Sequence, residues 1–143
     1  MTVLFEKVLI ATDGSERNQA AVQEGLRIAR ACGSAVYAVY VIDEASLTSA
    51  QQDVLTADVY GELREEGERA LGNLRQGAGG IRLETFLLSG RPAQVITGFA
   101  RERGIDLIVV GSQGKTGLER LLLGSVAESI IRLAECMVLV VKG

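Results

Sequence analysis

The most constraining feature of this sequence is the regular alternation of short apolar runs with helix-like segments. Five apolar runs occur along the chain, at positions 8–12, 35–42, 81–88, 107–110 and 137–141. Four of them are rich in Val, Ile and Leu and nearly continuous, which is typical of strands covered on both faces in a parallel sheet. The run at 81–88 begins by alternating apolar and polar residues, which favours a strand nearer the edge.

Segments with helical periodicity separate these runs. One begins at Ser15, which we expect to cap it, and continues to Cys32; the others cover about 57–74, 92–104 and a stretch that starts near Ser125. In the last segment the expected core-facing residues are Val126, Ile130, Leu133 and Ala134. Strict alternation of strands and helices predicts an α/β fold with a parallel sheet, right-handed crossovers and helices on both faces.

Length and composition indicate one globular domain and exclude several functions. We expect the 143 residues to form a single domain over positions 1–143. The sequence has no histidine, which excludes His-dependent triads and His-liganded metal sites. A formal charge of −3 and an aromatic content of 4% argue against nucleic-acid binding. No apolar run reaches the ~20 residues that span a bilayer, and the N-terminus lacks the basic start of a signal peptide, so we expect a cytoplasmic protein with no membrane partner.

The strongest candidate site is a glycine pattern that follows the fourth apolar run. Gly111 and Gly114 are followed by Lys115 and, after nine residues from Gly114, by Gly124 and Ser125 at the start of a predicted helix. Glycines at a strand end let backbone N–H groups approach an anion, and a helix N-terminus favours a phosphate. The pattern predicts a phosphate cradle; the alternative is a plain turn followed by an ordinary serine cap.

Two further candidates lie at the ends of the first two strands, where ligands bind in parallel α/β sheets. Asp13 offers a carboxylate that suits a base, a ribose hydroxyl or a cation. The alternative is that Asp13 only shapes a turn, because Asp-Gly-Ser is common turn chemistry. Val41 is suited to wall an adenine slot, and the alternative is an ordinary core position.

Taken together, these motifs resemble the universal stress protein family over nearly the whole chain. The resemblance is carried by residues 7–15, 41–43, 90–93 and 138–141 and by the glycine pattern, whose spacing marks the members of that family that bind ATP. It implies a Rossmann-like adenine-nucleotide-binding fold with a five-stranded parallel sheet in the order 3-2-1-4-5. It also implies a homodimer, and ATP in the cleft between the first and fourth strands.

Site residues follow from the resemblance position by position. It implies an adenine and ribose end formed by Ala11, Asp13 and Val41. It implies a phosphate end formed by Gly111, Ser112, Gly114, Lys115, Thr116, Gly124, Ser125 and Val126. Gln113 departs from the family, in which histidine or arginine is frequent at this place. A metal would be Mg2+ or Mn2+ bridging the phosphates rather than an ion in an all-protein cage.

We therefore interpret the chain as an ATP-binding regulatory or stress-response protein with at most slow hydrolysis. Hydrolysis needs a positioned water and a charge-stabilising cation, and only Asp13, Lys115 and Gln113 are available for such roles, so no catalytic residue is assigned. One alternative is a stand-alone enzyme that hydrolyses nucleotides or transfers nucleotidyl groups. Another is an interaction module that has kept the fold and lost the ligand.

The last apolar run predicts how the chain assembles. In the implied sheet order the strand at 137–141 lies on an outer edge, and a bare apolar edge invites another chain. We expect two copies to pair through this strand. The alternative is that the loop containing Leu121, Leu122 and Leu123 folds over the edge.

Overall fold

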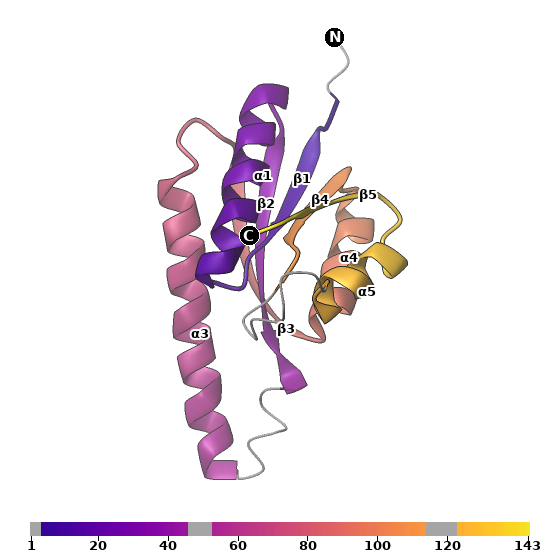
Figure 1. Ribbon diagram of the computed structural model, residues 1–143. Coiled ribbons are helices and arrows are strands. Elements are labelled where there is room, and N and C mark those ends of the chain that lie inside the picture. The colour runs from indigo at the N-terminus through magenta and orange to yellow at the C-terminus, as the bar shows by residue number, and fades with distance from the viewer. Residues whose placement is uncertain (1–3, 46–52, 114–122) are drawn as a thin grey trace.

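The structure is a computed structural model that describes residues 4–45, 53–113 and 123–143. Strands and helices alternate as predicted (Figure 1). In chain order the elements are β1 (Lys7–Ala11), a 3-10 turn (Glu16–Asn18), α1 (Gln19–Cys32), β2 (Ala35–Asp43), α3 (Asp53–Gln76), β3 (Leu83–Gly90), α4 (Pro92–Arg103), β4 (Leu107–Gly111), α5 (Ser125–Leu133) and β5 (Met137–Val141).

All strand pairs are parallel, and the sheet order is β3-β2-β1-β4-β5. This confirms the α/β fold, the order 3-2-1-4-5 and the position of the last strand at an outer edge. The strand order reverses beside β1, between β2 on one side and β4 on the other. In open α/β sheets a ligand crevice forms at such a reversal, outside the carboxyl ends of the strands.

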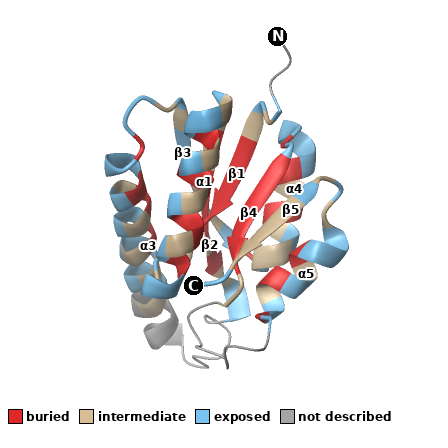
Figure 2. Cartoon of the chain, turned by 45° about the horizontal axis from the view of Figure 1, so that its top comes forward, coloured by how far each residue is buried: buried red, intermediate tan, exposed pale blue. Residues whose placement is uncertain are grey.

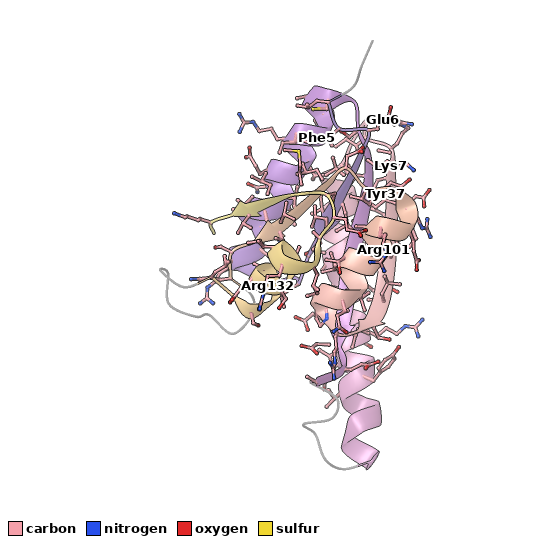
Figure 3. The ribbon with its side chains drawn as sticks, turned by 90° about the vertical axis from the view of Figure 1, so that its right-hand side faces the viewer. Phe5, Glu6, Lys7, Tyr37, Arg101 and Arg132 are labelled. Carbon is pink, nitrogen blue, oxygen red and sulfur yellow. The ribbon has the colours of Figure 1, made fainter. Side chains whose placement is uncertain are left out.

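Helices cover both faces of the sheet (Figure 2). Val8 and Ile10 of β1 point into the layer formed with α1 and α3, and Leu9 points into the layer formed with α4 and α5. All three side chains are fully buried, at 0% exposure. Helices α4 and α5 lie side by side over their face, with Arg101 on the first and Arg132 on the second (Figure 3). The two-sided burial is the reason that the central strands read as continuous apolar runs.

Two local expectations were wrong. The Ser15 side chain does not cap the helix; its hydroxyl donates to Asp13 instead, and a 3-10 turn intervenes before α1 begins at Gln19. Leu133 was expected in the core but is 47% exposed. It is the last residue of α5, where the chain turns into extended backbone, and the buried face of that helix runs through Ala127 and Ile130.

Within the part of the chain that the structure describes, no helix is both long and apolar enough to cross a membrane.

Gly25 shows how closely α1 packs on the sheet, and it gives a stability prediction. A Cβ added there would lie 2.7 Å from the Ile10 side chain. Replacing Gly25 by alanine should therefore lower the free energy of unfolding by about 1–3 kcal/mol, despite the better helix propensity of alanine. Urea unfolding measures this change.

The matched control is Gly72→Ala in α3, where an added Cβ meets no described heavy atom within 4 Å. There alanine should stabilise the helix by about 0.5–1 kcal/mol. An equal gain in stability for both variants would contradict the packing described for Gly25.

Candidate functional site at the carboxyl end of the sheet

A cavity of about 270 Å³ opens where the strand order reverses. It is bounded by the ends of β1, β2 and β4, by the N-terminal turns of α4 and α5, and by Leu63 of α3. The predicted site residues that line it are Ala11, Asp13, Val41, Gly111, Ser112, Gly124, Ser125 and Val126. Three predicted residues, Gly114, Lys115 and Thr116, lie outside the described residues.

One side of the cavity is apolar. Val39 and Val41 come from β2, Val110 from β4 and Ile96 from α4. Ile96 is only 3% exposed, so most of its side chain is buried in the core behind this wall. Mostly apolar walls with a few placed polar groups are typical of small-molecule sites. This wall suits a flat, weakly polar ring.

Asp13 stands in a tight turn directly after β1. The Thr12 N–H donates to the Val39 oxygen at 3.0 Å, which continues the β1–β2 pairing one residue past the strand. The Asp13 Oδ1 atom then accepts two hydrogen bonds from Ser15, from its N–H at 2.9 Å and from its hydroxyl at 2.6 Å. Gly14 adopts φ +78°, a left-handed conformation that favours glycine. The carboxylate therefore shapes the turn and also lines the cavity.

The N-terminus of α5 forms another part of the lining. The first backbone bond within this helix is donated by Glu128 to the Gly124 oxygen, at 3.0 Å. The N–H groups of Ser125, Val126 and Ala127 precede that bond and have no partner inside the helix, and these three residues line the cavity. Such groups, together with the helix dipole, favour an anion.

Gly124 has a different role from the one expected of a cradle glycine. Its N–H donates to the Ser112 oxygen at 2.7 Å, and the Ser112 N–H donates to the Val141 oxygen at 2.9 Å. Its backbone is extended, with φ −64° and ψ 155°. These bonds fix the start of α5 against the end of β4, so the backbone N–H of Gly124 is already used within the protein.

Several lining residues were not predicted. They include Thr12, Asn18, Tyr40, Asp43, Leu63, Pro92 and Ile96. Gln113, which the sequence analysis considered only for a role in hydrolysis, also lines the cavity. Asp43 is the last residue of β2, two positions after Val41, and a carboxylate at the carboxyl end of a strand is the signal that could have identified it. Leu63 carries no such signal in the sequence. It lines the cavity only because α3 extends past the end of the sheet (Figure 1).

The charges of the site differ from one part of the lining to another. Asp13 and Asp43 contribute carboxylates, which accept hydrogen bonds from hydroxyl and amino groups. The start of α5 contributes backbone donors, which favour an anion. Across residues 4–45, 53–113 and 123–143, no three His, Cys, Asp or Glu side chains gather as a metal-binding group. A ligand with hydroxyls, an apolar ring and a phosphate fits this arrangement.

Comparison with known proteins places the chain in a family. The pattern of the Universal stress protein family matches residues 4–142. Universal stress protein MJ0531 of Methanocaldococcus jannaschii is 42% identical, with 97% of this chain and 83% of that protein covered. The solved structure of MJ0577 from the same organism has 31% identity and a TM-score of 0.85, with 99% of this chain and 98% of that one covered.

A third relative was solved with a nucleotide. The universal stress protein from Archaeoglobus fulgidus in complex with dAMP has 25% identity and a TM-score of 0.62, with 99% of this chain and 100% of that chain covered. The match to the family pattern covers nearly all of the 143 residues, and the fold agrees with it. This chain therefore belongs to the universal stress protein family.

Proposed function

We propose that this protein binds ATP in the crevice between β1 and β4 and acts as a nucleotide-dependent regulator in the cytoplasm, with residues 1–143 forming one domain. The observation that carries the proposal is the composition of one cavity, which combines Asp13, an apolar wall and the N–H groups at the start of α5 that have no partner within the helix. The dAMP complex of the Archaeoglobus fulgidus relative supports an adenine nucleotide as the ligand class.

Each part of ATP has a counterpart in the proposed site. The adenine ring packs against Val41 and Ala11, and the ribose hydroxyls donate to Asp13. The phosphates lie at the start of α5, with Gly111 and Ser112 beside them. Gly114, Lys115 and Thr116 complete the phosphate end in this proposal. Mg2+ or Mn2+ would bridge the phosphates and supply charge neutralisation there.

The site offers few groups that could act as a general base, which favours a regulatory role over rapid hydrolysis of ATP. A general base must reach the attacking water, and no histidine exists in the chain to serve as one. Among the described lining residues, Asp13 and Asp43 are the carboxylates, and Oδ1 of Asp13 is held by Ser15. Slow hydrolysis is the most that this arrangement supports.

The proposal is tested by what the purified protein carries. Protein purified without added nucleotide is denatured and filtered, and the filtrate is examined by absorbance at 260 nm and by chromatography. An adenine nucleotide at a substantial fraction of one per chain is expected. A filtrate without nucleotide, together with no uptake of added ATP, would favour an interaction module instead. Multiple turnovers with excess ATP and Mg2+ would favour an enzyme.

We also propose that two copies pair through β5. The Val141 oxygen accepts from the N–H of Ser112, one residue past β4, so the peptide groups of Val141 face β4. Since peptide groups alternate along a strand, those of Val138 and Val140 face the open edge. Apolar surface accompanies this edge, because Met137 is 64% exposed and Leu133 is 47% exposed.

Replacing Val140 by proline should therefore yield monomers that keep their fold. Proline removes a donor that faces the edge and leaves the β4–β5 ladder intact. The molar mass measured by light scattering should fall from about twice 15.2 kDa for the wild type to 15.2 kDa for the variant. Val140→Thr, which keeps both the donor and the β-branched shape, should remain a dimer. A wild-type mass of 15.2 kDa at micromolar concentration would refute the pairing.

A further inference from the structure

Strands β1 and β4, which lie on either side of the cavity, stop pairing with each other before they reach it. Pairing between β1 and β4 ends at Ile10 and Val109. Both strands continue, but with other partners: Ala11 pairs with Val39 of β2, and Gly111 pairs with Val141 of β5. At their carboxyl ends, β1 still pairs with β2 and β4 still pairs with β5, but β1 and β4 no longer pair with each other. The crevice opens between them.

The side chain of Asn18 lies in the space between the ends of β1 and β4, beside Ala11 and Gly111. It is 3% exposed and lines the cavity. Its Nδ2 donates to the Ala11 oxygen at 3.3 Å, and its Oδ1 accepts from the Asp13 N–H at 3.3 Å. One amide thus satisfies the last carbonyl of β1 and the first N–H of the Asp13 turn.

The same amide lies against the backbone of β4. A Cβ built on Gly111 would be 3.2 Å from Nδ2 of Asn18, which is closer than most side-chain contacts. Asn18 therefore lies between the diverging ends of β1 and β4, and a side chain at position 111 would press against its amide. Burial without hydrogen bonds would be costly for an amide, and both of its ends are paired here.

We propose that Asn18 is a positioning residue for the nucleotide site. Its amide fills the space where β1–β4 pairing has ended, and its two hydrogen bonds to Ala11 and Asp13 hold the Asp13 turn where its carboxylate lines the cavity. This inference rests on the proposed nucleotide function, because the ligand is what Asp13 is positioned to meet.

The first test is a double-mutant cycle on affinity, since a residue acting through Asp13 should lose its effect when Asp13 is changed. Binding of ATP with Mg2+ is measured by calorimetry for wild type, Asn18→Ala, Asp13→Ala and the double variant. Asn18→Ala alone should weaken binding about tenfold, and in the Asp13→Ala background its effect should fall below about twofold. Wild-type affinity in folded Asn18→Ala, or an equal loss in both backgrounds, would overturn the inference. If Asn18→Ala does not fold, Asn18→Ser takes its place as the milder truncation.

The second test needs no ligand. In Asn18→Ala the Asp13 N–H loses its acceptor, so its hydrogen exchange should become about tenfold faster. The Thr12 N–H is the internal control, because its bond to the Val39 oxygen does not involve Asn18. Unchanged exchange at Asp13 would overturn the inference. Failure of wild type to bind ATP would refute the proposed function instead, and the exchange measurement would then decide the role of Asn18 alone.

Discussion

Replacing Ser125 by aspartate is expected to lower the affinity for ATP about a hundredfold without loss of stability. Ser125 is the first residue of α5 and lines the cavity. A carboxylate there is attracted by the positive end of the helix, a gain of about 0.3–1 kcal/mol in the free energy of unfolding. The same charge repels a phosphate about 5 Å away by roughly 3 kcal/mol at a protein surface. Calorimetric titration and thermal unfolding of one sample measure both effects.

Ser129→Asp is the matched control for this charge. It lies about one turn further along α5 and is not among the residues that line the cavity. The added charge is the same, but it is away from the N–H groups proposed to hold the phosphate. Its affinity should therefore stay within about threefold of wild type, because four residues add about 6 Å to the separation. The charge then lies roughly one Debye length from the phosphate, where distance and salt together weaken the repulsion. Wild-type affinity in Ser125→Asp would exclude a phosphate from the start of α5.

Asp13 should give the second large effect, and two substitutions separate its two roles. Asp13→Ala removes the acceptor of both Ser15 bonds and the carboxylate proposed to meet the ribose. It should lower the stability of the ligand-free protein by about 1 kcal/mol and weaken ATP binding by about 1–3 kcal/mol. Asp13→Asn keeps an oxygen for Ser15, so stability should be retained while affinity still falls. Thermal unfolding with and without ATP measures both quantities.

Ser15→Ala is the control for the turn. It removes the 2.6 Å bond to Oδ1 of Asp13 without changing a residue that lines the cavity. A small loss of stability with unchanged affinity is expected. If Asp13→Asn also binds ATP like wild type, Asp13 serves only the turn.

The architecture could be predicted because it depends on repeated signals. Each strand of the two-sided sheet reads as an apolar run, and each helix between strands has its own periodicity. The edge position of β5 followed from the implied order and is confirmed. The orientation of a short helix is less determined. A helix of nine residues, such as α5, has too few turns for its periodicity to fix which side faces the core. The sequence analysis therefore expected Leu133 in the core and did not include Ala127, whereas Ala127 is buried and Leu133 is exposed.

The details of the site depend on tertiary geometry that no local pattern carries. Asn18 matters only because β1 and β4 diverge after Ile10 and Val109, and a single asparagine near a helix start is unremarkable in sequence. Gly124 was expected to bring its backbone N–H to an anion, yet that N–H donates to the Ser112 oxygen, and its φ of −64° is open to any residue. A Gly124→Val variant would thus affect binding through its side chain at the cavity, and the backbone itself would not be strained.

Whether an adenine nucleotide occupies the crevice between β1 and β4 can be measured by a single titration. ATP with Mg2+ is added to uniformly 15N-labelled protein freed of bound nucleotide, and the backbone amide shifts are followed to saturation. We expect saturable shifts, with one nucleotide per chain, concentrated at residues 11–13, 41–43, 111–113 and 124–127. Shifts confined to other surfaces, or a spectrum unchanged by millimolar ATP, would contradict it.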